Sequence, residues 1–449
     1  MKKIYTLLIL LMATGCAWAQ NYTTYFMEGS TMRSQWNPAF APQRGYLNIP
    51  ALGNVQASIN GNIALDHIFY PQDGKLYTLL SANIPASLAL SGLEDMNRTG
   101  ADVSLNLIGF GAYTKNHKNF WSVDVSVKTA AELRAPYELF DFFKTGTSGS
   151  FANLGVDLNS FVETSFAYSL PILENLYIGA RVKFLVGIGS LGFNFDRFDA
   201  SMGADRWYAN AIGTLDVAGF QLETERLDDG TLVYDLEDVE FDDVSIPAGY
   251  GFGMDIGATY DLLPNLQFSL SINDLGFMAW SKKSTSTGRV DKELEFTGIE
   301  IDAAGNATQP SFDLDELNFE VIDAEAKTKA LRMSINAGAE YNVLDRRIGF
   351  GLFYHMNMLK YKTLHAITGS VNFRPFKWLH ASGSYTITGK DGNSFGLGLN
   401  ICPGFVNLFV GTDLLLCKKS PQWIPTKQHN MQVTFGLGIP LGPKGERHE

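Results

Sequence analysis

Three histidines in the C-terminal third are the first candidates for chemistry, because imidazole nitrogens bind transition metals and transfer protons near neutral pH. Strand alternation places His365 on the lipid-facing side and His380 on the lumen-facing side, so these two and His355 are not expected to converge on a metal. The chain also lacks the Gly-x-Ser-x-Gly, His-Glu-x-x-His, Walker and Cys-x-x-Cys motifs. We therefore expect no enzyme activity, no catalytic residue, no bound metal and no cofactor.

Charged residues on the polar faces of the expected strands are the stronger functional candidates. The residues expected to line a lumen are Glu163, Arg181, Lys183, Asp255, Arg332, Glu340 and Arg374. Charges inside a closed structure are costly unless they are paired or hydrated. Two interpretations stay open: the charges neutralise one another and lock the lumen, or they line a water-filled path that selects permeants by charge.

The elements that position these residues are strands, which period-two alternation identifies. In one clear segment, Phe252, Met254, Ile256 and Ala258 alternate with Gly253, Asp255 and Gly257. About 14 such segments, within a range of 12 to 16, follow one another from Tyr46–Ile59 to Met431–Ile439. They predict an all-β chain that forms a single antiparallel transmembrane β-barrel, with apolar side chains toward lipid and polar ones toward a lumen.

Short and long connections alternate along the chain, as in bacterial outer-membrane barrels, which have short periplasmic turns and long external loops. Two of the long segments are acidic: Asp196–Pro247 has 14 acidic and 3 basic residues, and Met278–Lys329 has 11 and 6. They are interpreted either as solvated loops or as cation-bridged contacts with lipopolysaccharide or a basic partner. The net charge of -12 argues against nucleic acid as a partner.

The N-terminus predicts export. Lys2 and Lys3 precede an apolar run and a small-x-small cleavage site, which defines residues 1–19 as a cleaved signal peptide, although Cys16 is an alternative lipidation site. Residues 20–44, which include Trp36, Asn37 and Pro38, are expected to form an N-terminal plug segment, and residues 45–449 the barrel. The predicted location is the outer membrane.

Two segments carry a resemblance to known barrels. Trp36-Asn37-Pro38-Ala39, followed by strands such as Gly251-Phe252-Gly253-Met254-Asp255-Ile256-Gly257, is similar to the FadL-type fatty-acid transporter superfamily. Ser271-Ile272-Asn273-Asp274-Leu275-Gly276-Phe277 with Trp280 resembles an uncharacterised family of exported barrels within that group. The resemblance implies a 14-stranded barrel with an N-terminal plug that moves hydrophobic molecules, or a cargo-shuttling barrel of the PorV type that serves type IX secretion.

Three functional hypotheses follow. The first is a plugged outer-membrane barrel that admits a small hydrophobic solute, and the second is an outer-membrane scaffold or secretion partner whose external loops bind another protein. A continuous apolar pocket beneath Asn21–Arg44 would favour the first, and a tightly filled lumen with ordered external loops the second. The third is a soluble periplasmic or lipid-anchored β-protein, in which the apolar strand faces pack against each other. In the first two, outer-membrane lipid and lipopolysaccharide surround the barrel.

Overall fold

The fold is a closed antiparallel β-barrel of 14 strands. The computed structural model describes residues 22–63, 67–72, 75–146, 148–202, 207–220, 222–235, 246–296, 318–389, 393–415, 418–419, 425–426 and 431–446. The expected signal peptide, Cys16 and parts of both acidic segments lie outside these ranges. Among the described residues, no helix is long and apolar enough to cross a membrane.

Each wall strand pairs with its neighbours in chain order. The wall consists of β1 (Arg44–Asn48) continued by β2 (Val55–Gly61), β5 (Met96–Tyr113), β6 (Phe120–Pro136), β8 (Leu154–Leu173), β9 (Leu176–Met202), β13 (Gly249–Leu263), β14 (Leu266–Trp280), β17 (Lys327–Ala330) continued by β18 (Ser334–Val343), β19 (Ile348–Met358), β20 (Thr363–Phe376), β21 (Leu379–Ile387), β22 (Asn393–Ile401), β23 (Asn407–Leu415) and β26 (Met431–Lys444). The barrel closes where β1 and β2 pair with β26 on one side and with β5 on the other.

Alternation along the strands separates two environments, as predicted. On β13 the side chains of Phe252 and Ile256 are exposed on the outside, whereas Asp255 and Thr259 are buried inside. The same outward exposure recurs around the barrel at large apolar residues, including Val123, Phe166, Val182, Phe184, Leu270, Leu352, Ile367, Val371, Leu397 and Val410. The apolar faces therefore do not pack against each other, and the exterior has the pattern of a transmembrane barrel.

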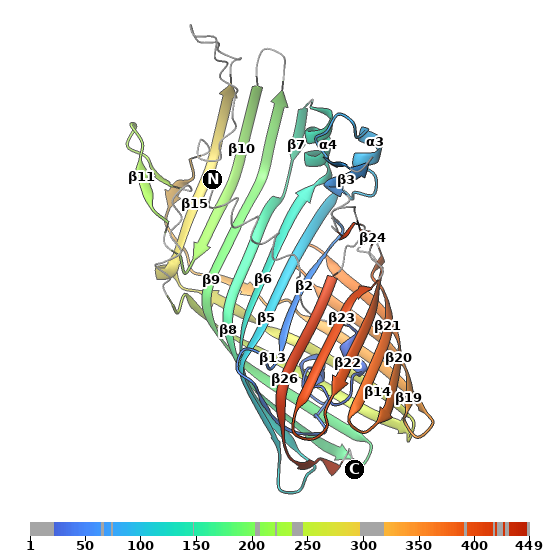
Figure 1. The fold of residues 1–449 in the computed structure, drawn as a ribbon. Helices are drawn as coiled ribbons and strands as arrows, with labels where there is room; N and C mark the ends of the chain where they lie inside the picture. The colour runs from blue at the N-terminus through green and yellow to red at the C-terminus, as the bar shows by residue number, and fades with distance from the viewer. Residues whose placement is uncertain are drawn as a thin grey trace.

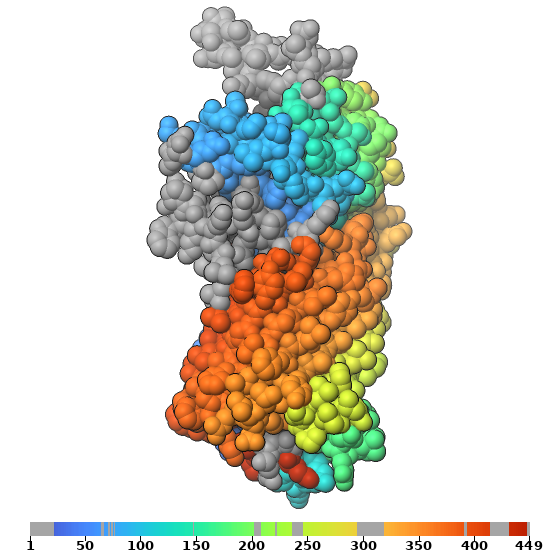
Figure 2. Space-filling model, turned by 90° about the vertical axis from the view of Figure 1, so that its right-hand side faces the viewer, coloured from blue at the N-terminus to red at the C-terminus, as the bar shows by residue number. Residues whose placement is uncertain are grey.

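The connections between wall strands are short at one end of the barrel and long at the other. The end with the short connections, here named the turn end, carries the links β8–β9, β13–β14, β18–β19 and β20–β21 (Figure 1). The other end, named the loop end, carries the long connections. Four wall strands, β5, β6, β8 and β9, rise well beyond the rest of the wall at the loop end (Figure 1). Figure 2 shows these blue and green segments above the orange and red C-terminal strands.

The extension at the loop end contains much of the chain that was expected to be loop. Strands β10 (Trp207–Ala218) and β15 (Thr285–Phe296) continue the sheet beside the upper half of β9. The smaller elements are β3 (Phe69–Gln72), β4 (Lys75–Thr78), α3 (Ala86–Ala89), α4 (Tyr137–Thr145), β7 (Ser148–Phe151), β11 (Thr224–Arg226), β12 (Leu232–Tyr234), η3 (Lys282–Ser284), β16 (Glu320–Ile322), β24 (Lys418–Lys419) and β25 (Pro425–Thr426). The described parts of both acidic segments thus contribute strands to the sheet.

Two strand predictions need correction. The segment Tyr46–Ile59 is two strands, because the chain leaves the sheet between Asn48 and Val55. Alternation of Leu331, Met333, Ile335, Ala337 and Tyr341 with polar residues also predicts a strand that begins at Leu331. The strand begins only at Ser334, since the chain is irregular between β17 and β18. Leu331 therefore turns inward, where it packs against the cluster around Leu185, instead of facing lipid with Ile335.

Candidate functional site in the barrel lumen

The N-terminal segment, Tyr22 to Phe40, lies inside the barrel at its turn end. It begins with the 3-10 helix η1 (Tyr22–Phe26) and ends after the short helix α2 (Arg33–Trp36). The aromatic side chains of Tyr25, Phe26, Trp36 and Phe40 pack against Phe353 of β19. The rings of Tyr25 and Phe353 are stacked with centroids 3.9 Å apart. Burial of these rings favours the seated position of the segment.

Polar side chains from the wall bind the end of α2. The backbone oxygen of Trp36 accepts hydrogen bonds from Ser271 Oγ at 2.7 Å, Asn273 Nδ2 at 2.9 Å and Asn336 Nδ2 at 3.1 Å. Asn37 Nδ2 donates to the backbone oxygens of Ala258 and Leu270, each at 3.2 Å. The two residues expected in a plug thus contact three adjacent wall strands, β13, β14 and β18.

Pro38, the third expected plug residue, lies against a wall position where only glycine fits. A Cβ atom added at Gly179 would lie 2.3 Å from the backbone carbon of Pro38, and one added at Gly257 would lie 2.0 Å from Asn37 Oδ1. Real Cβ atoms do not approach other atoms this closely. Because glycine has no side chain, the N-terminal segment packs directly against the backbone of the wall at these two positions.

We expect Gly257→Ala to displace the segment around Asn37. The matched control is Gly369→Ala on β20, where an added Cβ would meet no atom within 4 Å. Trypsin cleavage after Arg33, whose side chain is buried in the seated segment, measures the displacement. Faster cleavage is expected in Gly257→Ala alone. Equal cleavage rates in the two folded variants would contradict the prediction.

An ion-pair cluster at the turn end binds the N-terminal segment through Glu28. Glu28 lies 2.8 Å from Arg346, 3.6 Å from Arg374 and 4.0 Å from Arg33, measured between charged atoms. Arg374 also contacts Glu340 at 2.5 Å. The cavity beside Glu28 and Arg346 has a volume of only about 50 Å³, which holds a few water molecules. On the side of Glu28 and Arg346, the turn end is filled by charge-paired side chains.

The three arginines control the ionisation of Glu28. Burial alone would raise the pKa of this carboxyl group, but the arginines, Arg374 first, lower the pKa well below its usual value near 4.5. A group with a lowered pKa stabilises the folded arrangement above its unfolded pKa and loses that contribution as the pH falls through the lowered value. The segment should therefore stay seated in mildly acidic solution.

Glu28→Gln is expected to weaken the seating at every pH above the lowered pKa, because three arginines lose their shared anion. Hydrogen exchange at the amides of Met27, Arg33 and Asn37, which donate to backbone oxygens of the same segment, reports the seating. These amides should exchange faster in the variant at neutral pH, and the difference should shrink on strong acidification. A wild-type protein that loses protection already at mildly acidic pH would refute this account.

A second cluster lies in the wall at the middle of the barrel. Asp255 is fully buried between Arg181 at 3.2 Å and Lys183 at 2.7 Å. Lys183 also contacts Asp274 at 2.6 Å, two strands away on β14. Beside it, Lys128 and Glu163 pair at 2.7 Å. Arg181 Nη2 additionally donates to the backbone oxygen of Ser34 at 2.9 Å, which connects this cluster to the N-terminal segment.

A third cluster crosses the lumen near the loop end. Arg332, just before β18, reaches Asp102 of β5 at 2.7 Å and Glu132 of β6 at 3.8 Å. Strands β5 and β18 lie on opposite sides of the wall, so this contact spans the barrel. Lys329 contacts Ser190 Oγ at 3.1 Å and Asp157 at 3.8 Å. We name these contacts of Lys329 and Arg332 the upper bridge.

All seven residues expected to line the lumen lie inside the barrel, and each contacts an opposite charge in one of these clusters. These contacts favour the interpretation in which the lumen charges neutralise one another over the one in which they line a water-filled path. The sequence reasoning missed several of their partners, namely Glu28, Asp102, Lys128, Glu132 and Asp274. Asp274 was missed for a structural reason: a bulge in β14, where its φ is 59°, turns it inward out of phase with the alternation.

His365 and His380 lie on opposite faces of the wall, as the alternation predicts. His355 is buried and its Nδ1 lies 2.7 Å from Asn336 Oδ1, His380 is buried in the lumen, and His365 lies on the outside with its Nδ1 at 2.8 Å from the Tyr354 hydroxyl. Within the described ranges, no group of three or more His, Cys, Asp or Glu side chains is arranged to hold a metal.

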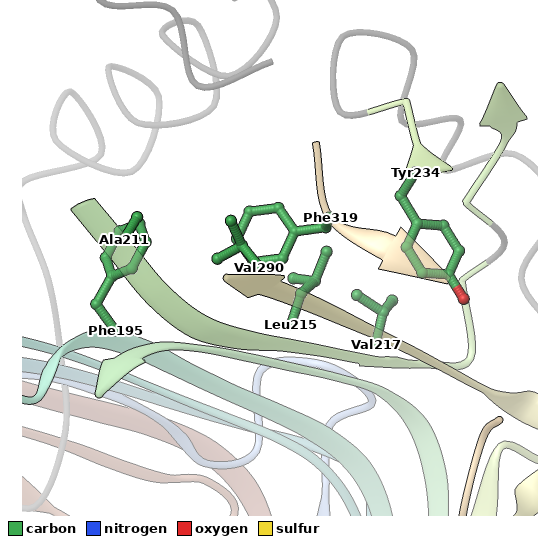
Figure 3. Packing of buried hydrophobic residues seen from close by; sticks show 7 residues of the cluster. All are labelled: Phe195, Ala211, Leu215, Val217, Tyr234, Val290 and Phe319. Carbon is green, nitrogen blue, oxygen red and sulfur yellow. The ribbon is translucent and has the colours of Figure 1, made fainter. Parts of the chain in front are cut away.

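Apolar side chains form two clusters in the extension at the loop end. One cluster joins β9, β10 and β15 to β12 and contains Phe195, Ala211, Leu215, Val217, Tyr234, Val290 and Phe319 (Figure 3). A second cluster, around Tyr70, Ile84 and Phe140, lies under α3 and α4. Leu154 packs against both clusters and points to the face of β8 opposite that of Asp157 in the upper bridge. We name the two clusters with Leu154 the apolar vestibule.

Comparison with solved structures finds barrels of similar extent. The toluene transporter TbuX of Ralstonia pickettii is 8% identical, covers 92% of this chain and 98% of its own, and has a TM-score of 0.43. The CymD monoaromatic hydrocarbon channel is 9% identical, with coverages of 96% and 99% and a TM-score of 0.43. A FadL homologue of Pseudomonas aeruginosa is 8% identical, with coverages of 92% and 92% and a TM-score of 0.38.

The search of curated proteins found no match. A family model does match, over residues 38–413, which include the end of the N-terminal segment, both clusters at mid-lumen and the loop end, and all but the last wall strand. Since the match covers most of the chain, the protein belongs to the family of unknown function DUF5723.

Proposed function

We propose that this barrel lies in the outer membrane with its turn end toward the periplasm, and that it admits small, uncharged, apolar solutes from outside. The observation that carries the proposal is the concentration of apolar side chains in the apolar vestibule, which lies at the same end of the barrel as the upper bridge. Apolar side chains collect an apolar solute, and side-chain contacts such as those of Arg332 separate without unfolding the wall.

The N-terminal segment acts as the plug in this proposal. It fills the turn end with the aromatic cluster around Trp36 and is held by hydrogen bonds and ion pairs, not by strand pairing with the wall. Such contacts permit rearrangement while the 14 wall strands stay paired. The protein described here would then be the closed state, and passage would require movement at both ends of the lumen.

Solute uptake into liposomes tests the proposal. We expect the protein to accelerate entry of toluene, an apolar solute, but not of sorbitol, a polar one. Leu154→Asn, which places an amide between the two apolar clusters, should slow toluene entry, whereas Leu262→Asn at the exposed turn end should not. If the folded protein accelerates neither solute, or if both variants behave alike, the transport proposal fails.

Placement in the outer membrane rests on the exposed apolar exterior, which lipid and lipopolysaccharide would cover. A heat-modifiability gel on detergent-extracted membranes tests it, because a closed barrel resists SDS until it is boiled. We expect a mobility shift on boiling and no release of the protein by carbonate. Recovery in the soluble periplasmic fraction without a shift would overturn the placement.

Two observations favour a second candidate, an outer-membrane scaffold or secretion partner. The first is the lumen, in which paired charges and the N-terminal segment fill much of the space. The second lies at the loop end. Strands β10 and β15 form a sheet that projects beyond the wall, beside the hairpin β11–β12 (Figure 1). The segment Asp196–Pro247, with 14 acidic and 3 basic residues, suits a basic protein surface. Removal of Thr224 to Val244 should then abolish crosslinks to a partner while toluene uptake persists. Unchanged crosslinks would dismiss this candidate.

A further inference from the structure

A larger cavity lies at the turn end, between the N-terminal segment and the wall. Its volume is about 310 Å³, which falls at the lower end of the range, about 300–1,000 Å³, seen for small-molecule sites. The lining comes from β1, β26, the N-terminal segment and the connections β20–β21 and β22–β23. The cavity is separate from the three charge clusters and from the apolar vestibule, and the proposed transport does not use it.

Cationic side chains dominate this cavity. Arg44, Lys377 and Lys444 line it, and none of the described residues in the lining is acidic. Arg44 donates to two neutral acceptors, the backbone oxygens of Gly442 at 2.7 Å and Gly404 at 3.3 Å. The charge clusters described above pair their cations with carboxylates, whereas here three cations line one space. An anion is the ligand that such a space favours.

The remaining lining combines the polar residues Thr31, Gln43 and Asn407 with apolar and aromatic residues. The ring of Tyr46 is buried and fixed, because its hydroxyl lies 3.2 Å from both oxygens of Asp124. The indole of Trp378 stacks on Phe376 with ring centroids 5.4 Å apart and planes 3° from parallel. Three prolines, Pro42, Pro403 and Pro440, complete the apolar lining. These surfaces suit a compact apolar body next to the cations.

We infer that this cavity binds a small organic anion, with its carboxylate facing Arg44, Lys377 and Lys444 and its apolar body against Tyr46 and Trp378. Charge-assisted hydrogen bonds are roughly twice as strong as neutral ones, so the charge of the ligand determines its affinity. The inference requires the fold but not solute uptake. It therefore stands or falls independently of the transport proposal.

Fluorine NMR on the full chain folded in detergent tests the inference with two probes of similar size and shape. Fluorobenzoate carries the anion, and fluorobenzyl alcohol does not. We expect saturable binding of fluorobenzoate, and at least roughly tenfold weaker binding of the alcohol, from the loss of charge-assisted contacts. A protein that binds both probes equally would overturn the inference, since the cations would then have no role.

Variants localise the binding. Lys377→Gln/Lys444→Gln removes two cations and leaves the backbone contacts of Arg44, and it should weaken fluorobenzoate binding by about tenfold or more. Lys282→Gln makes the same type of change on an exposed side chain at the loop end and should have no effect. Unchanged binding in a heat-modifiable double variant would refute the site. Retained fluorobenzoate binding with no toluene uptake would remove only the transport proposal.

Discussion

Asp255→Asn is expected to leave most of the protein unable to reach the folded, heat-modifiable state. The carboxylate is fully buried and lies within ion-pair distance of both Arg181 and Lys183, and its Oδ1 accepts the backbone N–H of Asp274 at 2.8 Å. Removing one member of a buried ion pair costs about 3–5 kcal/mol, because its partner is left uncompensated. That is a large part of the roughly 5–15 kcal/mol by which proteins are stable.

The matched control for this variant is Asp291→Asn. Asp291 lies on β15 and pairs with Arg289 at 3.7 Å, but both side chains are more than half exposed. Such surface pairs contribute little, so the folded fraction should equal that of the wild type. The double variant Arg181→Met/Asp255→Asn should recover part of the loss, because Arg181 is the cation that Asp255→Asn leaves without its carboxylate. Equal folded fractions in Asp255→Asn and Asp291→Asn would show that the buried cluster is not needed for stability.

Lys329→Ala/Arg332→Ala is expected to open the loop end of the lumen. The side chains of Arg332 and Asp102 are 28% and 33% exposed, so their contact across the barrel is partly hydrated and can break without loss of the fold. If the bridge contributes about 1.4 kcal/mol to closure, its removal raises the open population roughly tenfold. Asp102 and Glu132 then line the opened neck, which should prefer cations.

Conductance in planar bilayers measures this effect. The variant should show more frequent cation-selective openings than the wild type, and Lys282→Ala, which removes an exposed lysine at the same end, should not. Combining the double variant with Gly257→Ala should increase conductance further, because the N-terminal segment is a second obstruction at the turn end. A variant as silent as the wild type, even in this combination, would mean that neither obstruction controls passage.

Local periodicity predicted much of the wall. In a strand such as β13, the sequence alone assigns each residue to one of the two faces of the sheet. The residues on the exposed face have apolar side chains, and those on the inner face are small or charged. The inward positions of Asp255, Arg181 and Glu340 followed from this rule. The rule failed where the backbone departs from regular pairing, as at Leu331 between β17 and β18 and at Asp274 in the bulge of β14.

The partners of the lumen residues could not be predicted in the same way. Arg332 and Asp102 are 230 positions apart, and their contact depends on the diameter of the barrel and on an irregular segment that leans inward. Trp36 and Asn37 were expected in a plug, but their acceptors and donors come from β13, β14 and β18. Such contacts depend on how the whole barrel closes, and the residue pattern of a single strand does not predict them.

The seam of the barrel sets an order of events for assembly. Tyr46 pairs with Pro440, so the first wall strand meets the last only after nearly the whole chain is available. Residues 22 to 40 precede that first strand and end up enclosed. The wall must therefore close around the N-terminal segment, which has to lie within the curved sheet before β1 pairs with β26.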